Sequence, residues 1–104
     1  MTRGDVYSVH LPRARGHEQN GSRYGVIVQT DELIDLSTVI VAPTSRSAAP
    51  TSFRPEIDVR GQATRVLVEQ LRAVDLDRLR EQVGRLSFSE QRAVDDALAL
   101  VLGI

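Results

Sequence analysis

The pattern of hydrophobic and polar positions in the first half of the chain predicts three strands. Residues Gly4–Leu11 alternate between two faces, the spacing expected of a strand. A continuous apolar run from Tyr24 to Gln29 indicates a central strand that is covered on both faces. The β-branched run Ser37–Pro43 predicts a third strand, which Pro43 is expected to stop.

The pattern continues in strands before it changes to helical spacing. Phe53–Val59 is expected to be an edge strand, because Pro55 cannot donate to neighbours on both sides. The alternation of Thr64–Asp75 is typical of a further strand. Asp75 is then a plausible N-cap for a short helix that runs from Leu76 to about Gln82.

The carboxyl-terminal segment carries the clearest helical signal. After Gly84 and a brief strand ending at Leu86, Ser87–Glu90 form a capping box, and apolar residues then recur at helical spacing as far as Gly103. The apolar stripe of this helix is expected to pack on the rest of the domain or on a partner subunit. Short strands followed by helices at the end, without strand–helix alternation, predict a mainly β fold in which an antiparallel sheet closes into a small barrel. With 104 residues, the chain is expected to be a single domain over residues 1–104.

Candidate chemistry lies between the first two predicted strands. The segment Gly16–Arg23 is polar and rich in glycine, and it places Glu18, Gln19 and Ser22 beside Arg23 at the start of an apolar strand. Binding and catalytic groups are often mounted on such loops above a rigid strand. The same composition also suits a plain hairpin connection.

Composition narrows the functional classes. All thirteen basic residues are arginine, which excludes a lysine-dependent phosphate-binding loop and Schiff-base chemistry, although a GC-rich genome would also give this bias. A net charge of −1 argues against a general polyanion binder, so phosphate contacts would have to come from a local arginine patch. Cysteine is absent, and His10 and His17 do not have metal-ligand spacing, so neither a metal nor a cofactor is expected. The amino terminus lacks the apolar stretch of a signal peptide, and the expectation is a cytoplasmic protein without membrane association.

Three segments together resemble the MazF/PemK family of toxin endoribonucleases. The family signature is RG(D/E)(V/I)(Y/W), then GSEQxGxRP, then a run of Val and Ile that ends near Gln. The matching segments here are Arg3–Tyr7, Gly16–Arg23 and Val26–Gln29. Tyr24 stands where the family has proline, which restores a backbone N–H beside Arg23.

Two later positions extend the resemblance. Thr44, followed by Ser45, occupies the place of a family threonine that lies beside the arginine, and Gln70 fits a second family block within Glu69–Arg72. The resemblance implies a small Src-homology-3-like barrel of the MazF/CcdB type with a carboxyl-terminal helix. It also implies a homodimer that binds a cognate antitoxin.

The resemblance further implies the activity and its residues. The expected function is that of a type II toxin, a metal-independent, sequence-selective endoribonuclease that cleaves single-stranded RNA by attack of the 2′-hydroxyl. Arg23 and Thr44 correspond to the catalytic pair, and Glu18 is a candidate proton acceptor that would otherwise orient Arg23. The residues expected to bind RNA are Gln19, Ser22, Ser45 and Gln70. Two alternatives stay open: a non-catalytic gyrase poison like CcdB, and a plain interaction domain.

Overall fold

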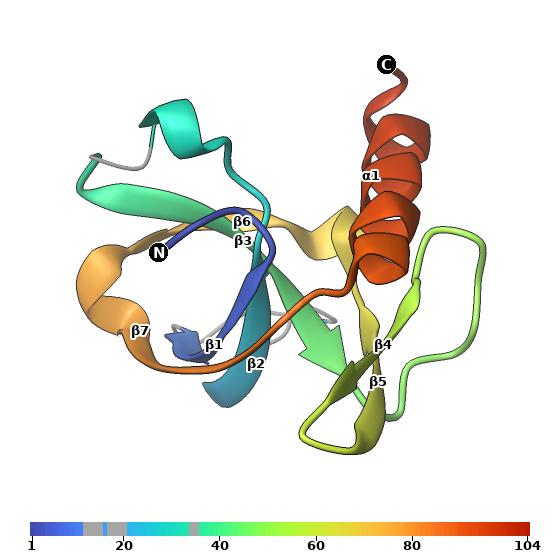
Figure 1. Cartoon of the computed structure of the whole chain (residues 1–104), viewed down its shortest axis with the longest axis horizontal. Coiled ribbons are helices and arrows are strands. Elements are labelled where there is room, and N and C mark those ends of the chain that lie inside the picture. The colour runs from blue at the N-terminus through green and yellow to red at the C-terminus, as the bar shows by residue number, and fades with distance from the viewer. Residues whose placement is uncertain (12–15, 17–20, 34–35) are drawn as a thin grey trace.

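The structure, a computed structural model, describes residues 1–11, 16, 21–33 and 36–104 (Figure 1). Its strands are β1 (Asp5–Leu11), β2 (Gly21–Ile27), β3 (Thr38–Ser45), β4 (Glu56–Val59), β5 (Gln62–Val66), β6 (Arg72–Asp75) and β7 (Leu79–Arg85). Among these residues, three short 3₁₀ turns, η1 (Asp31–Leu33), η2 (Val68–Gln70) and η3 (Leu76–Arg78), join some of the strands, and one helix, α1 (Phe88–Leu102), follows.

The strands form one antiparallel sheet that curls on itself. Its order is β4-β5-β3-β2-β1-β7, and β6 pairs with β3 beside this path. The long strand β3 is the pivot of the curl, because its first half pairs with β6 and its end pairs with β5. Figure 1 shows the resulting half-barrel, with α1 standing beside the β4–β5 hairpin. The predicted antiparallel barrel with a carboxyl-terminal helix is confirmed in this curled form.

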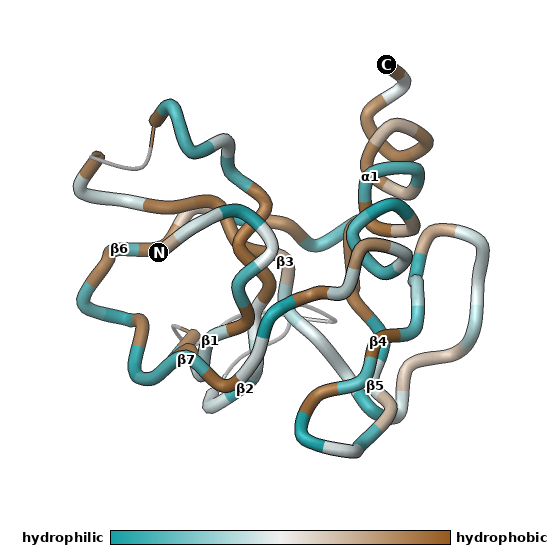
Figure 2. The backbone as a smooth tube through the Cα atoms, viewed as in Figure 1, coloured by the Kyte–Doolittle hydropathy of each residue, from teal (hydrophilic) through white to brown (hydrophobic). Residues whose placement is uncertain are grey.

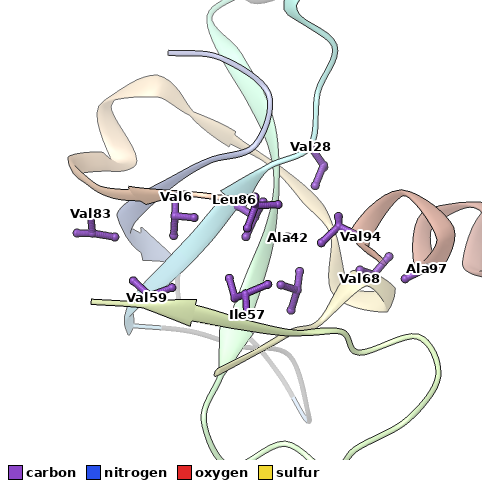
Figure 3. Packing of buried hydrophobic residues seen from close by; sticks show 12 residues of the cluster. Val6, Val28, Ala42, Ile57, Val59, Val68, Val83, Leu86, Val94 and Ala97 are labelled. Carbon is purple, nitrogen blue, oxygen red and sulfur yellow. The ribbon is translucent and has the colours of Figure 1, made fainter. Parts of the chain in front are cut away.

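Apolar side chains cover both faces of the central strands. One core cluster lies between β1–β3, the β4–β5 hairpin and α1 (Figure 3); it includes Val6, Val26, Ala42, Ile57 and Val94. A second cluster fills the opposite side of the sheet, with Val9, Leu11, Ile27, Val41 and Val74. In β2 the neighbours Val26 and Ile27 belong to different clusters. The expectation that this strand is central and covered on both faces is therefore confirmed, although it begins at Gly21 and ends at Ile27.

The prediction that Pro43 stops the third strand is wrong. β3 continues to Ser45, with Pro43 opposite Gly25 of β2. Proline lacks an N–H to donate, but its carbonyl accepts a hydrogen bond from the Leu67 N–H at 2.8 Å, so pairing continues through it. Thr44 consequently lies on a rigid strand and not in a loop.

The helix predicted from Leu76 to Gln82 is also wrong. Only the turn η3 forms, the Asp75 side chain makes no capping hydrogen bond, and the chain enters β7 at Leu79. β7 pairs along β1 with register shifts near Tyr7, so pairing with an available strand edge prevails over a weak local helical signal.

Two other predicted strands are shorter or divided. The edge strand predicted over Phe53–Val59 is β4, which is at the end of the sheet order but begins only at Glu56. The segment Thr64–Asp75 is divided into the end of β5, the turn η2 and β6. Its alternating pattern comes from two strands, β5 and β6, which the turn η2 separates. β5 pairs with the end of β3, and β6 pairs with its first half.

Residues of the amino-terminal motif Arg3–Tyr7, with Thr2 before it, stabilise the fold. We call Thr2, Arg3, Asp5, Asp31 and Asp95 the amino-terminal clamp. Arg3 donates from Nε to the Val28 carbonyl at 3.1 Å and from Nη2 to Asp95 of α1 at 2.7 Å. The Thr2 hydroxyl and the Arg3 N–H donate to the Asp31 carboxylate, each at 2.7 Å, and buried Asp5 accepts from the Thr2 N–H at 2.9 Å. The clamp joins the start of the chain to α1.

Helix α1 begins as predicted. The Ser87 hydroxyl accepts from the Glu90 N–H while the Glu90 carboxylate accepts from the Ser87 N–H, and Gly103 ends the helix in a left-handed conformation. Val94 and Ala97 are buried against the sheet, whereas Leu100, Leu102 and Ile104 are exposed. Figure 2 shows that α1 carries apolar stretches as far as its free end. No helix in the described part of the chain is long and apolar enough to cross a membrane.

Candidate functional site

A pocket of about 310 Å³ opens where three segments of the curled sheet meet. Its lining residues come from β2, from the end of β3 and from the β4–β5 hairpin: Ser22, Arg23, Tyr24, Thr44, Ser45, Arg46, Val59, Gln62 and Thr64. Arg23 and Thr44, which are expected to be the catalytic pair, thus lie in the walls of the same pocket.

Strand register brings these residues together. The pairing of Gly25 with Pro43 sets the end of β3 beside the start of β2. On its other edge, β3 pairs Thr44 with Val66 and Ser45 with Arg65 of β5. Because antiparallel neighbours are about 5 Å apart, functional groups from three distant stretches of sequence reach one surface.

Thr44 is fixed to the backbone beside Arg23. Its side chain is only 4% exposed, and its hydroxyl donates to the Tyr24 carbonyl over 3.0 Å. The hydroxyl oxygen still has lone pairs that can accept a further hydrogen bond. This bond ties the end of β3 to β2 at the residue that follows Arg23.

Arg23 and Ser22 are exposed on β2, and Tyr24 is half-buried against the main core cluster. Ser45 is buried, with its hydroxyl 3.4 Å from that of Ser47. The guanidinium of Arg23 is permanently charged and offers several donors to an anion. Rigid strands therefore present a cation and the Ser22 hydroxyl at the surface, while Thr44 and Ser45 are buried in the pocket wall.

The charged side chains among the described lining residues are all positive. Arg23 and Arg46 contribute two guanidinium groups, and none of the nine described lining residues carries a carboxylate. Such a wall suits phosphate groups, which guanidinium can bind with paired hydrogen bonds. In the described part of the chain, no group of three or more His, Asp or Glu side chains is placed to hold a metal ion.

Three polar lining residues were not anticipated from the sequence, and neither was the apolar Val59. Arg46 directly follows Thr44 and Ser45, so its position beside the motif was an available signal. Gln62 and Thr64 enter through the register of the β4–β5 hairpin, which no local pattern reveals. Neither residue type stands out in a single sequence.

Other predicted site residues lie elsewhere. Gln70 is half-buried in η2, which packs against α1, and it does not line this pocket. Glu18 and Gln19 lie outside the described residues, as does His17. Phe53 does not line the pocket either, and the Arg54 guanidinium lies over its ring, 5.6 Å from the ring centre.

Two carboxyl groups outside the pocket have lowered pKa values. The hydrogen bond from the Thr2 hydroxyl, then the one from the Arg3 N–H, lowers the pKa of Asp31. Burial acts to raise the pKa of Asp95, but hydrogen bonds from Arg3 and Gln91, with the charge of Arg3, outweigh it and leave this pKa lowered. Both groups belong to the amino-terminal clamp, so these shifts reflect structural hydrogen bonds and, for Asp95, the ion pair with Arg3.

Comparison with known proteins places the chain in a family. Residues 2–102 match the family described as PemK-like, MazF-like toxin of type II toxin–antitoxin systems. A candidate toxin of Mycobacterium tuberculosis is 41% identical over 106 residues, an alignment that covers 100% of this chain and 99% of that protein.

Solved structures agree on the fold. MazF from Deinococcus radiodurans superposes with a TM-score of 0.87 at 20% identity, covering 100% of this chain and 97% of that one. A mycobacterial endoribonuclease, solved in complex with its cognate antitoxin, gives a TM-score of 0.82 at 17% identity, covering 100% of this chain and 96% of that one. The chain therefore belongs to the PemK-like, MazF-like family of toxins of type II toxin–antitoxin systems.

Proposed function

We propose that this toxin is a metal-independent, sequence-selective endoribonuclease that cleaves single-stranded RNA. The observation that carries the proposal is the presence of Arg23 and Thr44 in the wall of one pocket whose described lining residues carry no carboxylate. A scissile phosphate bound there would meet a fixed cation and a hydroxyl on rigid strands.

In the proposed reaction the RNA supplies its own nucleophile. The 2′-hydroxyl loses its proton as its oxygen attacks the adjacent phosphorus, and the bond from phosphorus to the 5′-oxygen breaks. The departing 5′-oxygen takes up a proton from water, so the products carry a 2′,3′-cyclic phosphate and a 5′-hydroxyl. Negative charge accumulates on the non-bridging oxygens as the phosphorane forms. Arg23 stabilises this charge by donating hydrogen bonds, and such preorganised donors are typically worth about 3–4 kcal/mol.

Thr44 has two roles in this scheme. In the unliganded pocket its hydroxyl donates to the Tyr24 carbonyl and thereby holds the end of β3 against β2. When a phosphate is bound, rotation of the hydroxyl proton would let Thr44 donate to a non-bridging oxygen. The Tyr24 carbonyl therefore sets the position of the Thr44 hydroxyl in the unliganded pocket.

Proton transfer requires an acceptor for the 2′-hydroxyl proton. A guanidinium stays protonated near neutral pH and is therefore a poor proton acceptor. We therefore assign this step to Glu18, with Arg23 as the alternative acceptor and an ion pair with Arg23 as the alternative role of Glu18. Ser22 and Ser45 contact RNA in the pocket, and Gln70 would contact a base outside it. Gln19 is a further residue assigned to base contacts.

We further propose a homodimer that binds a cognate antitoxin. An apolar groove lined by Val28, Ile40, Leu71, Leu98 and Leu102 lies beside α1, and Ile104 next to it is 89% exposed. An apolar surface of this kind is typical of a subunit interface. An acidic antitoxin segment would compete with RNA for the arginines of the pocket.

The test is cleavage of naked RNA in EDTA. Wild-type protein should cleave, whereas Arg23→Ala and Thr44→Ala should each lose cleavage by about 10²- to 10³-fold. Arg92→Ala is the matched control, because Arg92 is exposed on α1 and does not line the pocket. Intact RNA under all conditions, together with inhibition of gyrase, would support the CcdB-like alternative.

A further inference from the structure

A second guanidinium in the pocket has no role in the scheme above. Arg46 is exposed directly after β3, and its Nη1 donates to the side-chain oxygen of Gln62 on β5. The bond links the end of β3 to the β4–β5 hairpin and holds Arg46 along the wall that faces solvent. It removes part of the freedom that an exposed arginine would otherwise have.

The partner of Arg46 leaves its charge uncompensated. Within the described residues, Arg46 makes no ion pair, whereas five other arginines are near carboxylates: Arg3, Arg54, Arg60, Arg65 and Arg85. An amide oxygen fixes a guanidinium by a hydrogen bond but adds no opposing charge. Arg46 is thus oriented and remains fully cationic.

A second observation concerns Thr64 in the same pocket wall. Its side chain is 4% exposed, and its hydroxyl oxygen is buried without a hydrogen-bond partner among the described residues. Thr64 is two residues after Gln62 on β5, so the two side chains lie on the same face of the strand. Buried hydroxyls normally have hydrogen-bond partners. A buried hydroxyl without such a partner in a pocket wall indicates a group that can form a hydrogen bond with a ligand.

We propose that Arg46, oriented by Gln62, is a positioning residue that binds the RNA phosphate next to the scissile phosphate. This inference rests on the proposed function. RNA carries one phosphate per nucleotide, and the pocket presents a second guanidinium, that of Arg46 directly after β3, besides that of Arg23 on β2. The second contact sets the register of the strand, so that the scissile phosphate lies at Arg23 and Thr44.

The role predicts a specific kinetic signature. Arg46 touches a phosphate whose charge does not change in the reaction, so its loss weakens ground state and transition state equally. The variant Arg46→Gln should raise KM about tenfold, as expected for a hydrogen bond to a charged group, with kcat changed less than about threefold. Arg23→Ala should instead lower kcat.

Binding tests the inference without relying on cleavage. The probe is a fluorescent single-stranded RNA with 2′-deoxyribose at the cleavage site, titrated at several salt concentrations. For Arg46→Gln the slope of log affinity against log salt should become shallower by about 0.7, the value for one phosphate contact on a single strand. Arg46→Lys, which keeps the charge, should retain the wild-type slope.

Gln62→Glu provides a second variant that leaves Arg46 in place. The new carboxylate would neutralise Arg46, so the salt slope should fall as in Arg46→Gln. Ala63→Glu is the matched control, because Ala63 is exposed on the same strand but points to the other face and does not line the pocket. Thermal melts of all variants check that each is folded.

The outcomes separate the two proposals. Unchanged slopes and KM in Arg46→Gln and Gln62→Glu, with wild-type protein cleaving RNA, would overturn the inference and leave the proposed function intact. Equal loss in Gln62→Glu and Ala63→Glu would also overturn it, because the effect would then be general repulsion. A wild-type protein that binds the probe with the predicted slopes but leaves RNA intact would support the phosphate contact and overturn the nuclease.

Discussion

The hydroxyl of Thr44 donates a hydrogen bond to the backbone carbonyl of Tyr24 at 3.0 Å. This bond joins two strands at the place where the pocket opens and sets the end of β3 against the residue that follows Arg23. Tyr24 stands where the family signature has proline, but a carbonyl is present with either residue. The substitution therefore leaves the acceptor of this hydrogen bond in place.

Removal of the Thr44 hydroxyl should affect activity more than stability. Thr44→Ala should destabilise the fold by about 1 kcal/mol through the lost hydrogen bond, while cleavage falls by about 10²- to 10³-fold. Thr44→Ser keeps the hydroxyl and should retain most of the activity. Urea denaturation and single-turnover cleavage measure the two effects, and a large stability loss in Thr44→Ala with little loss of cleavage would assign Thr44 a structural role only.

Gly4 should not tolerate a side chain. Its φ is +93°, and a Cβ at this position would meet the side-chain oxygen of Gln91 on α1. We expect Gly4→Ala to lower the free energy of unfolding by about 1–3 kcal/mol. The double variant Gly4→Ala with Gln91→Ala removes the clash but not the backbone strain, so it should recover only part of the loss relative to Gln91→Ala alone.

Stability should fall in acid because of the amino-terminal clamp. The pKa values of Asp31 and Asp95 are lowered in the folded protein, so each carboxylate contributes stability above its ordinary pKa near 3.8. This contribution is lost as the pH falls from that value through the lower folded-state pKa, because protonation breaks the hydrogen bonds from Thr2 and Arg3. Urea denaturation at pH 6 and at pH 3 should show a smaller difference for Asp95→Asn than for wild type. An equal difference would show that Asp95 is not among the groups responsible.

The segment that follows Arg46 is anchored at its far end. Arg54 donates from Nε and Nη2 to one oxygen of Glu69, at 2.9 Å and 2.6 Å, and both side chains are about three-quarters buried. Glu69→Gln should lower the free energy of unfolding by about 1–2 kcal/mol after allowance for solvent screening. A double-mutant cycle with Arg54→Met measures the coupling, and additive effects would show that the pair contributes no interaction energy.

Much of the fold could be predicted from the sequence because its signals are local. Strand alternation in Gly4–Leu11, the apolar run before Gln29 and the Ser87 capping box each depend on neighbours in the chain. The course of the chain after Asp75 could not be predicted in the same way. A segment with helical spacing became β7 because it meets the edge of β1, a contact that is set by tertiary structure.

The residues of the site likewise divide into those that sequence motifs identify and those that only tertiary contacts bring into place. Arg23 and Thr44 stand in motifs, and the structure places both in one pocket. Arg46, Gln62 and Thr64 join them only through the register of β3 with β5 and of β5 with β4. A pocket made from three segments has no sequence signature in any one of them. The wall from the β4–β5 hairpin therefore could not be predicted from the sequence.

The most direct test of the central claim uses two RNA oligonucleotides that differ only in the sugar at the cleavage site. With ribose there, in EDTA, wild-type protein should produce a 2′,3′-cyclic phosphate and a 5′-hydroxyl, whereas Arg23→Ala should leave the RNA intact. With 2′-deoxyribose there, wild-type protein should bind equally well and cleave nothing. Cleavage of the deoxy substrate at the same bond, or products with a 5′-phosphate, would contradict attack by the 2′-hydroxyl in the Arg23–Thr44 pocket.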